Sequence, residues 1–97
     1  MRNPSKTGLK VNGDYVTAYG LMSEHHLQNQ VEWRGNHGKT VMYQSEFAYD
    51  VDTTYADDGY VSYYVDDKVT NHKAYGVGAY AYFRDYPVVV NNAIKAP

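Results

Sequence analysis

The residues best suited to chemistry stand together at 24–30, a polar stretch that holds the adjacent histidines His25 and His26 beside carboxamide side chains. The segment before it, residues 15–22, alternates with the period-two pattern of a β-strand. Adjacent side chains of a strand point to opposite faces, but a bulge or a strand end would let both imidazoles converge on one metal ion. The alternative is a pair of loop histidines without a ligand, because a histidine dipeptide alone is a weak signal.

Two more polar residues lie on predicted strands that could meet this stretch. Gln44 belongs to residues 39–47, where it lies on the face opposite the apolar one and is expected to point to solvent or to a cavity. His72 stands early in residues 69–84, and its face continues with an alanine and two glycines. Small residues there leave room for a ligand or for another strand to approach closely. His37 lies at a loop tip, where a solvated histidine is expected.

Other side chains could support such a site from outside. Glu24 and Glu46 could orient an imidazole, although each could equally be a surface carboxylate. Exposed rings such as Tyr75, Tyr80 and Tyr82 could stack on sugar faces, because an aromatic ring offers flat apolar area with a polar tip. Among the candidate rings Tyr63, Tyr64, Tyr75, Tyr80, Tyr82 and Tyr86, we expect most to lie in the core instead and only a few to reach substrate.

The composition indicates a single small domain that covers residues 1–97. With no cysteine, neither a disulfide nor a thiolate metal site can staple the fold, which leaves a histidine-bound metal, oligomerisation or an aromatic core. Nine basic and eleven acidic residues give a formal charge of −2 without a basic run, which argues against nucleic acid as a partner. No apolar stretch approaches the length that spans a bilayer, so no membrane is expected.

Strands and turns are predicted along the whole chain, and no window shows convincing helical periodicity. The Asn12-Gly13 dipeptide predicts one hairpin, and the loop at residues 35–38 predicts a second. The expected strands cover residues 9–11, 15–22, 31–34, 39–47, 60–65, 69–84 and 88–90. Short strands with closely spaced turn signals predict an all-β fold, a small antiparallel β-sandwich or barrel.

A histidine near one strand end, a glutamine on a second strand and a histidine on a third make the pattern of His25, Gln44 and His72 similar to that of metal cupins. In that fold a small jelly roll holds one ion among histidines and a carboxylate or carboxamide. The family places its first two histidines one residue apart, whereas His25 and His26 are adjacent. In addition, residues 24–25, 31–36, 43–46 and 76–86 look like a C-terminal region of large bacterial proteins associated with β-glucan breakdown, over most of this chain.

Together these features resemble a metagenomic family of copper-dependent, cellulose-oxidising enzymes of cupin fold. The resemblance implies a cupin-like jelly roll, one copper ion per chain, a homodimer, and a secreted oxidoreductase that has lost its signal peptide. It also implies oxidative cleavage of cellulose or a related β-glucan at chain ends. Carried over by residue, His25, Gln44 and His72 would be the catalytic ligands, with His26 as a fourth metal ligand. Imidazole nitrogens with one oxygen ligand suit Cu(II).

Two functions of other classes stay open beside the oxidoreductase. One is a non-catalytic carbohydrate-binding β-sandwich module, whose tyrosines bind glucan and whose histidines are incidental. The other is a β-sandwich that only caps or dimerises a larger glycan-active protein.

Overall fold

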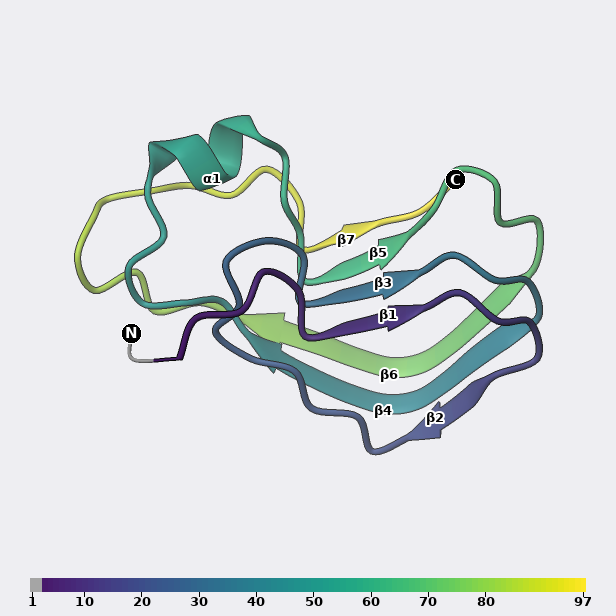
Figure 1. Cartoon of the computed structure of the whole chain (residues 1–97). Coiled ribbons are helices and arrows are strands. Elements are labelled where there is room, and N and C mark those ends of the chain that lie inside the picture. Colours follow the sequence, from purple (N-terminus) through teal and green to yellow (C-terminus); the bar gives the residue numbers. More distant parts are fainter. Residues whose placement is uncertain (1–2) are drawn as a thin grey trace.

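The chain winds repeatedly between two parallel sheets. The computed structural model describes residues 3–97. One sheet, in the order β1-β3-β5-β7, contains β1 (Leu9–Val11), β3 (Val31–Trp33), β5 (Tyr63–Val65) and β7 (Ile94–Lys95). The other, in the order β2-β4-β6, contains β2 (Thr17–Tyr19), β4 (Gly38–Glu46) and β6 (His72–Tyr80). Because the chain alternates between the sheets and each coil stacks on the one before it, the architecture is a parallel β-helix (Figure 1).

Successive coils set a fixed register between distant residues. In the first two coils, equivalent residues are 22 positions apart, as Leu9 is from Val31 in one sheet and Thr17 from Lys39 in the other. The next coil is longer because residues 47–62 form an extended connection that contains α1 (Thr53–Asp57). This connection and the one after β6 lie at the same end of the molecule, beyond the ends of β4 and β6 (Figure 1).

The predicted all-β content is confirmed, but the predicted antiparallel, cupin-like jelly roll is wrong. Asn12-Gly13 and residues 35–38 do turn the chain, yet each turn joins strands of different sheets and makes no hairpin. The expected closing strand at residues 88–90 is not a strand, and β7 follows it instead. Helix α1 was not predicted, because five residues are too few to show helical periodicity.

The turns between the sheets stack on one another through Asn36. Its backbone N–H donates to Asp14 Oδ1 at 2.7 Å, its carbonyl accepts from Tyr15 N at 2.9 Å, and its Oδ1 accepts from Thr70 N at 2.7 Å. Gly35 lies so close to the preceding turn that a Cβ atom would come within 1.9 Å of the carbonyl oxygen of Gly13. These contacts tie three successive coils together at the turn end of the molecule.

An aromatic core lies between the two sheets, but most of the tyrosines expected in the core are not there: Tyr75, Tyr80, Tyr82 and Tyr86 are exposed. Trp33 is fully buried, and the rings of Tyr43 and Tyr63 meet edge to face at 5.0 Å. Tyr63 hydroxyl lies 2.7 Å from Thr40 Oγ1, and burial raises the pKa of Tyr63 to about 12. A second, smaller core under the long connections contains Phe47, Ala48, Val51 and Tyr55. This second core fixes the connections at the strand ends where the candidate site lies.

Replacing Gly35 with Ala tests the tight stacking of the turns. The added methyl group cannot fit against the Gly13 backbone, so we expect the free energy of unfolding to fall by about 1–3 kcal/mol. The matched control is Gly13→Ala, whose Cβ meets only Val16 Cγ2 at an ordinary 3.7 Å and which should cost less than about 1 kcal/mol. Equal stability of the two variants in urea unfolding would contradict this stacking.

Candidate active site

Two glutamates occupy equivalent positions in successive coils. Met22 bridges to Gln44 in parallel, so two residues further along Glu24 comes level with Glu46. Glu46 in turn pairs with Tyr80, the last residue of β6. The parallel register therefore sets Glu24, Glu46 and Tyr80 at the same level of three successive coils, at the end of this sheet. The carboxyl group of Glu46 raises the pKa of the Tyr80 phenol.

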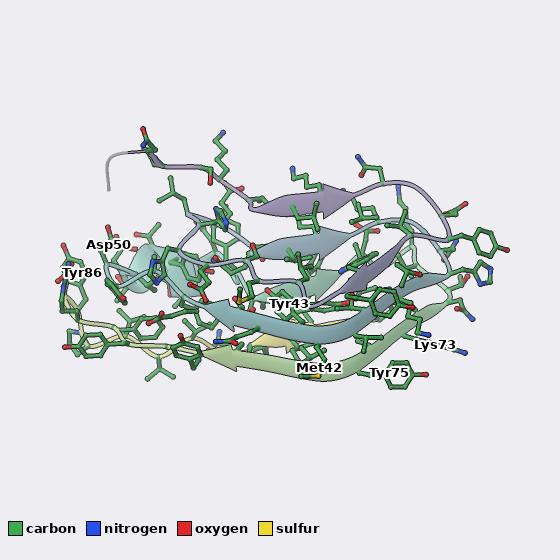
Figure 2. The ribbon with its side chains drawn as sticks, turned by 90° about the horizontal axis from the view of Figure 1, so that it is seen from below. Met42, Tyr43, Asp50, Lys73, Tyr75 and Tyr86 are labelled. Atoms are coloured by element: carbon green, nitrogen blue, oxygen red, sulfur yellow. The ribbon has the colours of Figure 1, made fainter. Side chains whose placement is uncertain are left out.

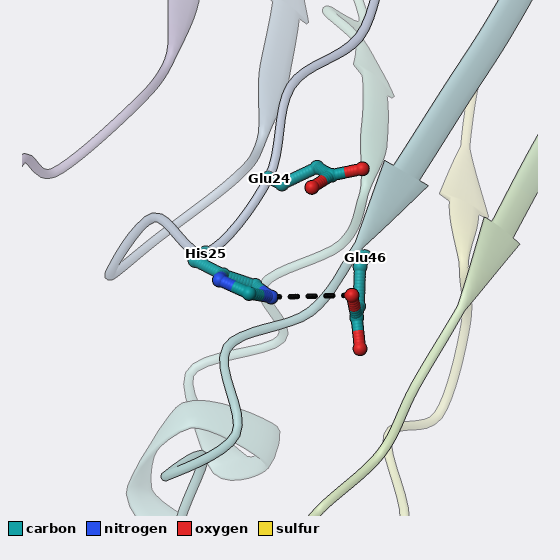
Figure 3. Close-up of side chains that lie close together, drawn as sticks. All are labelled: Glu24, His25 and Glu46. Carbon is teal, nitrogen blue, oxygen red and sulfur yellow. Dashed lines mark ion pairs between the residues drawn. The ribbon is translucent and has the colours of Figure 1, made fainter.

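The side chains of Glu24 and Glu46 converge with that of His25 (Figure 3). One nitrogen or oxygen atom from each of the three residues lies within 4.8 Å of the others, and His25 Nε2 is 3.3 Å from Glu46 Oε2. Glu46 is only 8% exposed. His25 Nε2 is buried as well, and among residues 3–97 it has the distance of an ion pair to Glu46 without the geometry of a hydrogen bond.

The loop that carries His25 is held in an unusual backbone conformation. His25 has φ of 60°, in the left-handed region that residues other than glycine seldom adopt, and its N–H donates to the Glu46 carbonyl at 3.0 Å. Fully buried Gln30 secures the next residues: its Oε1 accepts from His26 N at 2.9 Å, and its Nε2 donates to the carbonyls of His26 and Gln28, each at 3.1 Å. The loop is therefore built to present the His25 ring to Glu46.

A cavity of about 350 Å³ opens beside this group, and Glu24, His25, Tyr49 and Arg84 contribute to its wall. The His25 ring packs on Tyr49 at 4.5 Å, and the Arg84 guanidinium lies 5.3 Å from the Tyr49 ring centre. Tyr82 meets Tyr49 edge to face at 5.9 Å. The long connections thus place aromatic and charged side chains beside the carboxyl groups.

The same cavity includes Asp50 in its wall. Asp50 and Tyr86 lie at one end of the molecule, and Lys73 and Tyr75 lie at the other (Figure 2). The candidate site therefore occupies the end formed by the long connections, far from the stacked turns.

The structure does not bring the predicted ligands His72 and Gln44 together. His72 pairs with Gly38 at the start of β4, whereas Gln44 pairs with Gly78. Six residues of strand separate the two levels, about 20 Å at ~3.3 Å per residue. One ion cannot be bound by both. His72 Nε2 instead lies 2.6 Å from the Tyr63 hydroxyl, inside the end of the aromatic core.

The remaining predicted residues are distributed between the site and the surface. His26 lies next to the site, but its Nδ1 is 2.6 Å from Ser5 Oγ and it does not join the group of His25. Gln44 is exposed, as expected from its face. His37 is an exposed turn residue, as expected, and stacks on Tyr15 at 4.6 Å.

Glu24 and Glu46, considered from the sequence only as partners of an imidazole, are the centre of the candidate site. Their pairing has a signal in the sequence, because Glu24 and Glu46 are 22 positions apart, the same coil length that separates Gly13 from Gly35. Once this coil length is recognised as a repeat, it predicts that the two carboxyl groups lie side by side.

Comparison with known proteins relates the chain to glucan-degrading enzymes. The sequence model of the LAM55 pectate lyase-like domain matches residues 1–46. The chain is 43% identical over 90 residues to an exo-β-1,3-glucanase of Streptomyces sp. (strain SirexAA-E / ActE), and the match covers 88% of this chain but 15% of the glucanase. The chain thus spans less than a fifth of the length of this relative.

Two solved structures resemble the fold closely. They are sacteLam55A from Streptomyces sp. SirexAA-E and its E502A variant in complex with glucose. Each matches with a TM-score of 0.79 and 43% identity over 84% of this chain and 16% of the other. The fold therefore resembles a pectate lyase-like β-helix.

These similarities correct the predicted function. The relative is a glucanase, a hydrolytic enzyme, so the prediction of a copper-dependent oxidoreductase that cleaves cellulose oxidatively is wrong. The relation to β-glucan-active proteins is confirmed, whereas the identity as a copper cupin is not supported. A non-catalytic carbohydrate-binding module gains no support over an enzyme. In residues 3–97 no helix has the length and apolar character needed to cross a membrane.

The partly buried position of His72 predicts a pH dependence of stability. Burial lowers the pKa of His72 below its usual 6.5, so the unfolded chain binds this proton more tightly than the folded chain does. The contribution of neutral, buried His72 to the free energy of unfolding is therefore fully present above pH 6.5. It is lost as the pH falls through the lowered pKa of the folded chain. The pKa of His26 is also lowered, first by burial and then by the nearby His25, and it acts in the same direction.

His72→Gln should therefore weaken this pH dependence while keeping an amide that can bond to Tyr63. Urea unfolding would be followed between about pH 7.5 and about pH 5, the range in which histidines titrate. We expect the parent to lose more free energy of unfolding over this range than the variant does. Identical losses would show that His72 does not contribute to the pH dependence.

Proposed function

We propose that this chain carries the carboxyl pair of an enzyme that hydrolyses β-1,3-glucan. The observation that supports this most strongly is the convergence of Glu24 and Glu46, within 4.8 Å of one another at the strand ends, with Glu24 in the wall of a cavity. Most glycosidases use two such carboxyl groups on either side of the bond to be cleaved. The similarity to an exo-β-1,3-glucanase supplies the class of substrate.

Hydrolysis needs two proton movements, and the two glutamates suit different ones. Glu46 is the more buried, so we assign it the donation of a proton to the glycosidic oxygen as the carbon–oxygen bond breaks. Glu24 is half-buried and lines the cavity. Rotation of its side chain away from Glu46, to the separation of about 6.5–9.5 Å that leaves room for a water molecule, lets it take a proton from the water that adds to the anomeric carbon. The water is thereby divided between the two sugar products, and the net charge of the pair is unchanged.

The walls of the cavity offer contacts for the sugar. Tyr49 lines the cavity, and its neighbour Tyr82 lies outside the lining; both rings are exposed, and a sugar ring can pack its apolar face on such a surface. Asp50 lines the same cavity and can accept hydrogen bonds from hydroxyl groups. His25 contacts both Tyr49 and Glu46, so it links the aromatic surface to the carboxyl pair.

A glucan as partner also bears on location and assembly. A β-glucan polymer is too large to enter a cell intact, which favours action outside the cell, in keeping with the secreted location expected from the sequence. The homodimer stays a prediction. The chain is a fraction of the length of its glucanase relative, so the activity of the whole protein is part of this proposal.

Glu46→Gln tests the carboxyl pair. The amide keeps the shape of the side chain but cannot donate an acidic proton, so we expect glucose release from a soluble β-1,3-glucan to fall by roughly 10²–10⁴-fold. Glu24→Gln should reduce turnover by a similar factor, because the attacking water then loses its base. The control is Asp67→Asn, which removes an exposed carboxylate at the turn end of the molecule and should leave turnover unchanged.

Thermal unfolding of each variant shows whether the fold is retained. A folded Glu46→Gln protein that releases glucose at the rate of the parent would rule out Glu46 as the proton donor.

A further inference from the structure

We propose that Glu24, His25 and Glu46 also form a zinc(II)-binding site, and that zinc blocks the carboxyl pair. The proposal rests on the proposed function for its consequence, because zinc at this position would compete with the glucan. Binding of the ion itself depends only on the geometry of the three side chains. Among residues 3–97, no other group of three histidine or carboxylate side chains comes within the same 4.8 Å.

The distances match those of a small metal site. Zinc binds imidazole nitrogen and carboxylate oxygen at about 2.0–2.2 Å, so two ligands of a tetrahedral ion lie about 3.4 Å apart. His25 Nε2 and Glu46 Oε2 are already 3.3 Å apart. No ligand atom of the three is more than 4.8 Å from another, so Glu24 needs a movement of at most about 1.4 Å. A rotation of its half-buried side chain provides that movement.

The unsatisfied nitrogen of His25 also points to an ion. His25 Nε2 is inaccessible to water and faces a carboxylate without a hydrogen bond. A nitrogen lone pair and a carboxylate repel each other, so the contact is favourable only when a proton or a metal ion lies between them. The left-handed backbone of His25 and the packing of its ring on Tyr49 hold the nitrogen in this direction.

The three ligand types favour zinc over magnesium and calcium. One imidazole with two carboxylates is a suitable set for zinc, and three protein ligands leave a fourth position for water. Magnesium and calcium prefer oxygen ligands alone, and calcium needs at least six of them. The two carboxylates also balance the charge of a divalent ion. Arg84, which contributes its guanidinium to the cavity wall, is already paired with Asp85 at 2.9 Å and need not compete.

The test is a calorimetric titration of the full 97-residue chain with zinc chloride. We expect one zinc per chain, and no binding of magnesium under the same conditions. His25→Ala and Glu46→Gln should each weaken zinc binding by roughly tenfold or more, because each alters one of three ligands and even a change outside the ligand set typically costs about 10–100-fold. His37→Ala, which removes an exposed histidine at the opposite end of the molecule, should bind zinc like the parent. Circular dichroism would confirm that each variant is folded.

Glu24→Gln tests the third ligand independently and should also weaken zinc binding. The Glu24 side chain is half-buried, so its replacement should not disturb the core. Absence of zinc binding, or one zinc bound with unchanged affinity by folded His25→Ala and Glu46→Gln proteins, would overturn the proposed site. Addition of a β-1,3-linked glucose disaccharide tests the competition: it should weaken zinc binding if both need the same carboxyl groups. Zinc binding without glucan hydrolysis would contradict the proposed function alone, and hydrolysis without zinc binding would contradict this inference alone.

Discussion

The parallel stacking of successive coils is the constraint on which the rest of the structure depends. Hydrogen bonds between equivalent strands fix residues 22 positions apart at the same level, as they do for Leu9 and Val31. That register brings Glu24 beside Glu46. The two residues are 22 positions apart, so contacts between neighbours in the sequence would not bring them together. The close approach of Gly35 to Gly13 and the hydrogen bonds of Asn36 keep the coils in step at the far end. A slip of one residue would turn one of the two carboxyl groups to the opposite face.

Stability and chemistry occupy opposite ends of the molecule. The turn end is regular, with glycine at the closest contact and paired side chains between coils. The other end has long connections and a histidine, His25, whose backbone is in the left-handed region. There the buried carboxyl group of Glu46 lies beside His25 Nε2, which has no hydrogen-bond partner in residues 3–97. Strained backbone and buried charge reduce stability unless the surroundings hold them, and here Gln30 and the small core around Phe47 do so. Such features are typical of functional sites.

The sequence revealed the strands better than it revealed their arrangement. The positions of the strands around Lys39 and His72, the apolar face of Tyr43 and Ser45, and the aromatic core all followed from period two and composition. Topology did not, because alternation is the same in parallel and antiparallel strands and an Asn-Gly turn serves either. Two adjacent histidines led to the prediction of a ligand set that joins His25 to Gln44 and His72, and the structure does not bring Gln44 and His72 together. The spacing that mattered was the 22 residues from Glu24 to Glu46, which is informative only once the coil length is recognised.

The central claim, that the coil register assembles a catalytic carboxyl pair, is tested most directly by a crystal structure of the Glu46→Gln protein with a β-1,3-linked glucose oligosaccharide. The account predicts a glucose unit packed beside Tyr49, with its glycosidic oxygen within about 2.6–3.2 Å of the residue-46 side chain. Glu24 should lie on the side from which water reaches the anomeric carbon. A sugar bound elsewhere, with neither residue in contact with the glycosidic bond, would contradict it.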